Sequence, residues 1–442
     1  MCKSVCHFID DKAILICSIG IILYHHLTVN NCIQQKTLDR TNIDLYYTFN
    51  MKSTNVLRID TRRSKMKKMS HRERVNTAFS HKQPDRTPID LGSTRNSSIV
   101  VEGYEMLKSH FGIQEENALI SRMMRVVNVH EQILQALDID TRGVFPSTPP
   151  DIPTGDRSYK DEWGIERVNP PGSIYYDQVN FPLSGPVSIN DISKYPFPES
   201  EKPIRIKGLK ERIKHIHENN YAAILNMPSG FVHISQYLRG FEDWFADVAS
   251  DRKLIEFLFD AVLDVNLSMC HKILNEVGND VDVLMASDDL GFQDGLMISP
   301  QLYREIIKPR HRRYFQQMHE MSSAKVLFHT CGSVIDIMDD LIEIGVDGIH
   351  PVQVTAAGME PRKLKEKYGD RLVFWGGIDT QHVLPRGNVN EVKAEVEKRI
   401  EELGENGGYI LGAVHNIQPD VPLDNILAMY QYGRDYVKKG GV

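Results

Sequence analysis

Cysteine is scarce over most of this chain. Four of the six cysteines lie in the first 32 residues, and only Cys270 and Cys331 follow them. So few cysteines do not make a disulfide framework, and they favour a reducing, cytoplasmic compartment. The same scarcity indicates that Cys331 is not present as a structural crosslink.

Long apolar runs and an excess of basic charge are also missing. The apolar run 13–24 is too short to span a bilayer, and no run reaches the roughly 18 residues of a transmembrane helix. A signal peptide would have to accept Asp10 and Asp11 ahead of this run, and no clear small-residue cleavage site follows it. A net charge of -7 does not indicate nucleic acid. We therefore expect neither a stable membrane span nor a nucleic-acid partner.

Residues 1–68 differ in composition from the rest of the chain. A basic cluster occupies residues 62–68, and methionines stand at positions 51, 66 and 69. We expect residues 1–68 to be a poorly ordered extension, or to reflect a translation start assigned too early. The regular pattern begins at Met69, so the folded domain is expected to span residues 69–442. Ser70 and Glu73 have the spacing of a capping box and predict a helix that continues through Phe79.

From Met69 onward, short apolar runs alternate with longer helical patterns. Strands that alternate with helices pair in parallel, and eight of them predict a single-domain (β/α)8 TIM barrel. Residues 146–215, rich in proline and charge, are expected to form an excursion with short elements of its own. The predicted strands are 87–91, 142–145, 222–227, 282–287, 325–330, 346–350, 371–376 and 409–413, and the predicted helices include 251–277, 301–321, 333–344, 360–368 and 391–403.

Two predicted strands end in side chains that bind metals. His329 and Cys331 stand at the end of one strand, and His415 follows the last. Catalytic residues of such barrels gather at the carboxyl ends of the strands, and catalytic zinc takes three protein ligands with a fourth position open. The three residues are therefore predicted zinc ligands. The alternative is a buried cysteine in a glycine turn beside two unrelated histidines.

Three aspartates at strand ends are candidate catalytic residues. Asp288 and Asp289 follow an apolar strand, and Asp90 lies in the first predicted strand. Such carboxylates act as general acids or bases, bind a metal, or orient a histidine that does. The alternative for Asp288 and Asp289 is a helix N-cap and a solvated loop acid.

Four further residues are candidates for binding a substrate: Arg95, Tyr237, His350 and Asp379. Arg95 follows the first strand, where a guanidinium can hold a carboxylate, although a surface arginine explains it equally well. His350 and Asp379 stand at or just beyond strand ends, and Tyr237 lies in a helical stretch. A satisfied core histidine and helix packing are the alternatives for His350 and Tyr237.

Six motifs resemble the uroporphyrinogen decarboxylase superfamily in their order and spacing. The resemblance runs from about Met69 to the C-terminus and implies a (β/α)8 barrel, in agreement with the predicted strands. The motifs are Pro84-Asp85-Arg86-Thr87-Pro88, Ser299-Pro300, His329-Thr330-Cys331-Gly332, Gly345-Val346-Asp347-Gly348, Gly376-Gly377-Ile378-Asp379 and His415-Asn416-Ile417-Gln418-Pro419.

One branch of this superfamily decarboxylates a porphyrinogen without metal or cofactor. Its members hold the substrate carboxylates with the arginines of an Arg-Gln-Ala-Gly-Arg-Tyr stretch after the first strand. Residues 92–97 of this chain, at the corresponding place, contain a single arginine, Arg95. The chain therefore departs from the decarboxylase pattern, since an octacarboxylate needs several cationic partners.

Another branch contains zinc-dependent methyltransferases that work with corrinoid proteins. Their pattern is His-x-Cys followed much later by a cysteine; His329 and Cys331 match it, and His415 stands at the third position. The resemblance implies zinc-assisted methyl transfer between a small methylated substrate or thiol and a corrinoid on a partner protein. The alternatives are uroporphyrinogen decarboxylation and a non-catalytic protein that binds a tetrapyrrole or corrinoid.

Overall fold

Residues 68–436 are the part of the chain described by the structure, a computed structural model. The predictions made for residues 1–67 lie outside the described residues. The described residues belong to one compact unit. Among them, no helix is both long and apolar enough to cross a membrane.

Helix α2 (His71–Phe79) begins at a capping box. The Ser70 hydroxyl accepts a hydrogen bond from the N–H of Glu73, and the Glu73 carboxylate accepts one from the N–H of Ser70. This reciprocal pair satisfies two of the amide donors that a helix leaves free at its start. The Ser-x-x-Glu spacing in the sequence predicted this helix start, and the structure confirms it.

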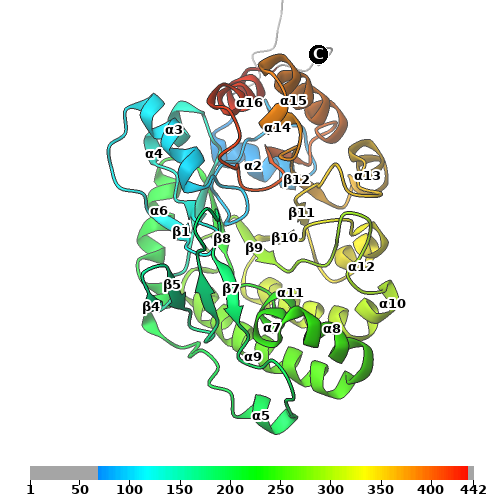
Figure 1. The fold of residues 1–442 in the computed structure, drawn as a ribbon. Helices are drawn as coiled ribbons and strands as arrows, with labels where there is room; N and C mark the ends of the chain where they lie inside the picture. The colour runs from blue at the N-terminus through cyan, green and yellow to red at the C-terminus, as the bar shows by residue number, and fades with distance from the viewer. Residues whose placement is uncertain (1–67, 437–442) are drawn as a thin grey trace, which may run out of the picture. The chain divides into compact units, whose positions relative to one another are not determined.

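Seven parallel strands form one curled sheet in the order β13-β12-β11-β10-β9-β8-β3 (Figure 1). Almost all of their residues are buried, as expected for a parallel sheet that is covered on both faces. Seven of the eight predicted strands are confirmed. They are β3 (Thr141–Val144), β8 (Ala222–Asn226), β9 (Val283–Ser287), β10 (Lys325–His329), β11 (Gly348–His350), β12 (Val373–Ile378) and β13 (Tyr409–Ala413).

The remaining predicted strand, residues 87–91, is not a regular strand. Ile89 makes one isolated parallel bridge to Leu411 of β13, and its C=O accepts a hydrogen bond from the N–H of Asp140, next to β3. The N–H of Ile89 donates to the side-chain Oδ2 of Asp140 at 2.7 Å instead of to a neighbouring strand. Pro88 has no N–H to offer. These two features limit this segment to a single bridge.

Helix α2 packs against the inner side of the curled sheet. A cluster of buried apolar side chains joins it to five strands, and members two residues apart in a strand point to the same face. The N–H of Arg72 in α2 donates to the C=O of Asn220, just before β8. The helix therefore lies near the amino ends of the strands. The cluster consists of Val75, Ala78, Phe79, Ala222, Ile224, Val283, Met285, Leu327, Val373, Trp375 and Ile410.

Most of the remaining helices lie around the outside of the sheet (Figure 1). The five predicted helical segments are confirmed, although 301–321 includes the π-helical turn Tyr303–Ile307 and 333–344 includes the 3-10 turn Ile335–Ile337. The helices are α6 (Leu209–Glu218), α7 (Phe231–Arg239), α8 (Phe241–Ser250), α9 (Arg252–Val277), α10 (Pro300–Leu302), α11 (Lys308–Met321), α12 (Met338–Glu343), α13 (Pro361–Tyr368), α14 (Val383–Arg386), α15 (Val389–Leu403) and α16 (Leu423–Asp435).

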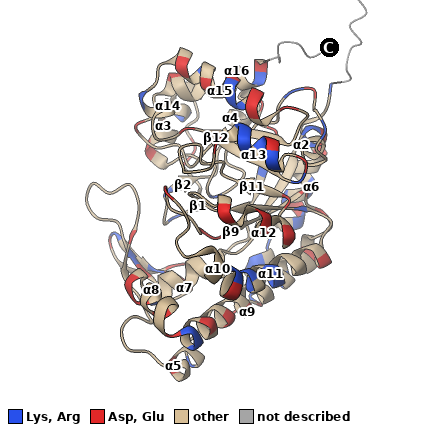
Figure 2. Cartoon of the chain, turned by 90° about the vertical axis from the view of Figure 1, so that its right-hand side faces the viewer, with Lys and Arg blue, Asp and Glu red and all other residues tan. Residues whose placement is uncertain are grey.

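Helices α11 and α12 meet through opposite charges. Lys308 of α11 lies 2.7 Å from Asp340 and 2.6 Å from Glu343, both of α12. Figure 2 shows the basic part of α11 close to the acidic residues of α12. Asp340 is buried, so its pair with Lys308 is shielded from water, whereas Glu343 is exposed and its pair contributes at most about 1 kcal/mol.

Short elements before β8 complete the fold. Residues 146–215 carry a four-stranded antiparallel sheet in the order β4-β5-β6-β7, which is the predicted excursion. The guanidinium of Arg167 in β6 lies 4.8 Å from the ring centre of Tyr237 in α7, so this excursion packs against α7, the helix that follows β8. The elements are α3 (Val101–Phe111), β1 (Leu119–Ser121), β2 (Val126–Val127), α4 (Glu131–Ala136), β4 (Ile152–Gly155), β5 (Ser158–Lys160), β6 (Glu166–Val168), β7 (Asp177–Asn180) and α5 (Ile189–Ser193).

Candidate metal centre

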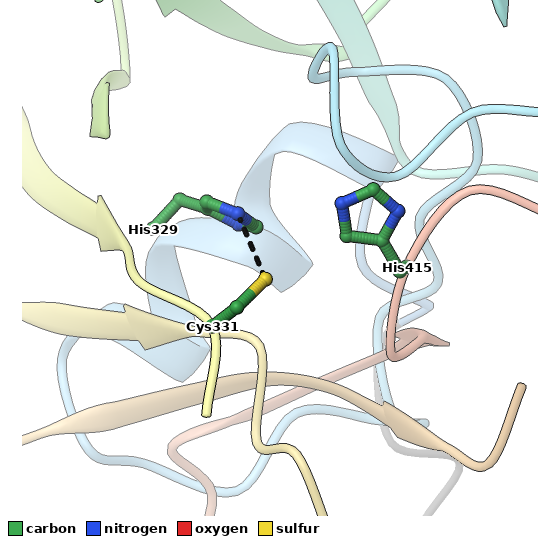
Figure 3. Close-up of side chains that lie close together, drawn as sticks. All are labelled: His329, Cys331 and His415. Atoms are coloured by element: carbon green, nitrogen blue, oxygen red, sulfur yellow. Dashed lines mark hydrogen bonds between the residues drawn. The ribbon is translucent and has the colours of Figure 1, made fainter. Parts of the chain in front are cut away.

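Three side chains from two strand ends meet at the carboxyl end of the sheet. His329 is the last residue of β10, Cys331 lies two residues further on, and His415 lies two residues beyond β13. Their ligand atoms all lie within 4.8 Å of one another, and Sγ of Cys331 is 3.4 Å from Nε2 of His329. Figure 3 shows the thiol and the two imidazoles around a common space. We call these three residues the ligand cluster.

The turn that carries Cys331 depends on Gly332. This glycine has a φ of 82°, in the left-handed region, and a Cβ here would lie 2.4 Å from the backbone of Gly291. The Thr330 hydroxyl accepts a hydrogen bond from the N–H of Leu290 at 3.0 Å. The loops after β9 and β10 are therefore held against each other, which brings the acids that follow β9 to the ligand cluster.

Asp289 links the ligand cluster to His233 of α7. Its Oδ1 accepts a hydrogen bond from the N–H of Cys331 at 2.8 Å and lies 3.6 Å from Nε2 of His329. Its Oδ2 lies 3.2 Å from Nε2 of His233. Burial opposes charge on both partners, but their attraction outweighs it: the pKa of Asp289 is lowered and that of His233 is raised. The pair therefore favours a carboxylate beside an imidazolium.

Burial keeps the ligand cluster itself uncharged. It lowers the pKa of His329 to about 3 and also lowers the pKa of His415. Burial, with the nearby charge of Asp289, raises the pKa of the Cys331 thiol. Without a cation the cluster holds two neutral imidazoles and a thiol. A divalent cation would favour loss of the thiol proton, because a coordinating sulfur binds as the thiolate.

Asp288 has both carboxylate oxygens engaged. They accept hydrogen bonds from the N–H groups of Val232 and His233 at 3.3 and 2.8 Å, in the first turn of α7. The second oxygen also lies 3.1 Å from Nε2 of His311 in α11. Only 1% of the residue is exposed. Asp288 thus joins three elements, while Asp289 is the acid that faces the ligand cluster.

Asp90 lies in the interior beneath the site. Its Oδ1 accepts a hydrogen bond from the hydroxyl of Thr141 at 2.5 Å, and its Oδ2 accepts one from the indole N–H of Trp375 at 2.9 Å. Only 1% of the residue is exposed. The structure therefore places this predicted catalytic acid among buried partners, outside the ligand cluster.

The loop 92–98 brings Arg95 and Asn96 to the same end of the sheet. The side-chain nitrogen Nδ2 of Asn96 lies 3.4 Å from Nε2 of His415. The guanidinium of Arg95 donates to the C=O of Met227 at 3.5 Å and lies 5.7 Å from the ring centre of Phe145. Burial lowers the pKa of Arg95 to about 10.

A cavity of about 150 Å³ opens beside the ligand cluster. Asp379 is one of its lining residues and accepts a hydrogen bond from the N–H of Gln381 at 2.7 Å. No lysine or arginine of residues 68–436 lines this space. We call it the mouth cavity; its lining is Cys331, Gln353, Thr355, Asp379, Thr380, Gln381, Val414 and His415.

The two other predicted substrate-binding residues lie outside the lining of the mouth cavity. His350 is 0% exposed and lies behind His329, with 2.7 Å between their Nδ1 atoms. Tyr237 stacks on His233 with 5.8 Å between ring centres, and Arg167 covers its ring. Tyr237 therefore reaches the site through His233.

Sequence reasoning missed His233 and Asn96. His233 precedes Tyr237 by four residues, so both lie on one face of α7. That spacing was the available signal, since Tyr237 was already a candidate. Asn96 follows Arg95 directly, and nothing in its sequence context distinguished it from a loop asparagine.

The sequence of this chain matches a known protein family. Residues 178–436, more than half of the chain, match the family described as Uroporphyrinogen decarboxylase (URO-D). The chain therefore belongs to the uroporphyrinogen decarboxylase family.

The similar relatives and a solved structure are methyltransferases. The chain is 25% and 24% identical over 180 residues to two proteins named methylcobamide:CoM methyltransferase MtaA, from Methanosarcina barkeri and from its strain Fusaro. Each match covers 40% of this chain and 49% of the relative, so the chain spans about half the length of these relatives. A methyltransferase from Methanosarcina mazei superposes with a TM-score of 0.58 at 18% identity, covering 83% of this chain and 99% of that one. The two relatives support the methyltransferase-like branch of the family, and the solved structure supports the fold.

Proposed function

We propose that this chain is a methyltransferase that binds zinc through His329, Cys331 and His415. The observation that carries the proposal is the convergence of two imidazoles and one thiol within 4.8 Å. This donor set fits zinc, which takes nitrogen and sulfur ligands and keeps one position open in catalytic sites. Zinc bonds are about 2.0–2.3 Å long, so binding would draw the three atoms closer together.

The proposed reaction moves a methyl group between a small substrate and a corrinoid on a partner protein. Relatives named methylcobamide:CoM methyltransferase support this reaction. Zinc would supply a Lewis acid for the sulfur or oxygen of the substrate. The mouth cavity, at about 150 Å³, is smaller than the roughly 300–1,000 Å³ of sites for drug-sized ligands and suits a small substrate.

The residues around the ligand cluster would orient the substrate and supply a proton. Asp379 offers a carboxylate in the mouth cavity, and Arg95 would hold an anionic group of the substrate. His233 beside Asp289 favours the protonated imidazole and so acts as a proton donor. In the cleavage of a methyl ether, His233 would give this proton to the alkoxide that leaves, and a reduced corrinoid on the partner protein would accept the methyl group.

Porphyrinogen decarboxylation is the rival function within the family. It needs several cations around the substrate carboxylates, whereas the loop 92–98 supplies only Arg95 and no cation of the described residues lines the mouth cavity. Incubation with uroporphyrinogen, followed by chromatography of the products, tests this function directly. We expect no decarboxylated product.

We propose further that residues 69–442 form a closed (β/α)8 barrel. The segment around Ile89 would take the place of the first strand, because its contacts reach β13 and the residue before β3, the two edges of the seven-stranded sheet. A cytoplasmic location is proposed from the scarcity of cysteine after residue 32, since a thiolate ligand such as Cys331 stays reduced there.

Metal analysis of purified variants tests the zinc site. The wild-type chain is expected to hold about one zinc ion, and Cys331→Ala and His329→Ala are expected to lose it because two ligands do not make a stable site. His415→Cys should retain zinc, since a thiolate also binds it. Cys270→Ala is the matched control: it removes the other cysteine of the described residues, buried in α9, and should leave zinc bound.

Two results would contradict the proposal. One is a wild-type protein that binds no zinc and is fully active in methyl transfer. The other is Cys331→Ala that retains zinc as tightly as Cys270→Ala does.

A further inference from the structure

We propose that His350 is a positioning residue that holds His329 in the one tautomer able to bind a metal through Nε2; this inference rests on the proposed zinc site. His350 was expected to bind substrate, but none of its surface is exposed. Its contact with His329 gives it a different role.

The two histidines face each other because of strand register. His329 ends β10 and His350 ends β11, and the two residues are paired in register on these neighbouring parallel strands. Their rings lie 5.0 Å apart at 34°, with 2.7 Å between the two Nδ1 atoms. A separation of this size is a hydrogen bond, so one Nδ1 carries a hydrogen and the other accepts it.

The surroundings of His329 decide which nitrogen must be free. Its Nε2 faces the ligand cluster, 3.4 Å from Sγ of Cys331, and lies 3.6 Å from Asp289. A neutral imidazole has one N–H and one lone pair, and only the nitrogen with the lone pair can bind a metal. Metal binding through Nε2 therefore requires His329 to donate from Nδ1, with His350 as the acceptor.

The ring of His350 makes no other hydrogen bond among the described residues. Its Nε2 is buried and has no hydrogen-bond partner within residues 68–436. The ring's one hydrogen bond in this part of the chain is the contact with His329. Metal-binding histidines commonly donate their second nitrogen to a carboxylate or carbonyl, which fixes the tautomer. Here an imidazole takes the place of that acceptor.

Two substitutions separate a hydrogen-bond acceptor from a packing group. His350→Asn keeps a side-chain oxygen that can reach the position of Nδ1 but leaves part of the volume empty. His350→Leu fills the volume better and removes the acceptor. Positioning predicts that the Asn variant binds zinc more tightly than the Leu variant. Packing alone predicts the reverse order.

The experiment measures the zinc dissociation constant by competition with a chelator, for the wild type and both variants. Loss of such a partner weakens metal binding about 10- to 100-fold, which is the change expected for His350→Leu. Val326→Ala is the control, since Val326 is a buried residue of β10, the strand that carries His329, and its side chain points to the opposite face of the sheet from that of His329. It should lower the unfolding temperature and leave zinc affinity unchanged. Circular dichroism verifies that each variant is folded.

The outcomes separate this inference from the proposed function. If the wild type binds zinc and His350→Leu binds it equally well, or better than His350→Asn, the positioning role is wrong and the zinc site stands. If the wild type binds no zinc, the proposed function is wrong and the role of His350 falls with it. Weaker binding in the order wild type, Asn, Leu supports both.

Discussion

Arg95 is a cation without an acidic partner among the described residues. Its contacts there are the C=O of Met227 and the ring of Phe145, neither of which carries a charge. Burial alone lowers its pKa to about 10, which reflects the cost of a desolvated charge that no carboxylate offsets. An anionic group on the substrate would supply the missing partner.

Arg95→Gln is therefore expected to weaken binding of an anionic substrate about tenfold or more, because a hydrogen bond to a charged group contributes roughly 1.5–3 kcal/mol. Calorimetry with 3-mercaptopropionate and with neutral 2-mercaptoethanol measures the difference. Arg362→Gln, an exposed substitution on α13, is the control. Equal losses for the two thiols in Arg95→Gln would exclude recognition of the anion.

At the scale of secondary-structure elements, Asp288 fixes the start of α7. An acid at a helix N-terminus accepts amide hydrogens and interacts favourably with the helix dipole. The close approach depends on Gly230, where a Cβ would lie 2.1 Å from the Asp288 carboxylate. Because α7 also carries His233, the anchor sets where the proposed proton donor lies.

Asp288→Ala is expected to lower the free energy of unfolding by about 3 kcal/mol, since it leaves buried donors of α7 and His311 without an acceptor. Urea unfolding measures this loss. Asp294→Ala removes an exposed acid from the loop after β9 and should change stability by no more than about 0.5 kcal/mol. A fully stable Asp288→Ala with reduced activity would instead indicate a direct catalytic role.

At the scale of the whole molecule, buried ion pairs join α2, the turn 84–88 and Asp140, the residue before β3. Arg74 lies 2.6 Å from Asp85 and 2.5 Å from Asp140, and Arg86 lies 2.6 Å from Asp140. Part of the Pro-Asp-Arg-Thr-Pro motif belongs to this network. The motif therefore acts in the fold near the amino ends of the strands, away from the ligand cluster.

This network predicts loss of stability in acid. Burial tends to raise the pKa of Asp140, but the opposite effect of His71, Arg86 and Arg74 is larger, so the pKa is lowered overall. Arg74 likewise lowers the pKa of Asp85. Because the folded-state pKa values lie below the ordinary value of 3.8, the stabilisation is present above about pH 4 and is lost as the pH falls through the lowered values. Unfolding free energies measured from pH 7 down to pH 2 should therefore fall in the acid range.

Asp140→Asn tests the origin of that pH dependence. Removal of one partner from a buried pair costs about 3–5 kcal/mol, so the variant should be less stable at pH 7. Its stability should also fall less steeply below pH 4, because one of the titrating groups is gone. An unchanged acid slope would assign the effect to other carboxylates, such as Asp282, whose pKa is also lowered.

Features that depend on near neighbours in the chain could be predicted from the amino-acid sequence alone. Apolar runs of strand length predicted eight strands, and seven are confirmed because a strand buried on both faces must be apolar throughout. Ser70 and Glu73 predicted the start of α2, because a capping box involves residues three apart. His329 and Cys331 are only two residues apart, so the sequence also predicted that they lie together at one strand end. His415 was indicated by its position after the last predicted strand and then by the family pattern.

Which side chains far apart in the sequence meet depends on the three-dimensional fold. In the folded protein the N–H of Ile89 donates to the side chain of Asp140, so the predicted strand 87–91 is reduced to a single bridge. The fold turns Asp289 toward the ligand cluster and Asp288 into α7, and it pairs His350 with His329 through strand register. These contacts depend on how the sheet curls and how loops pack, which no local pattern in the sequence records.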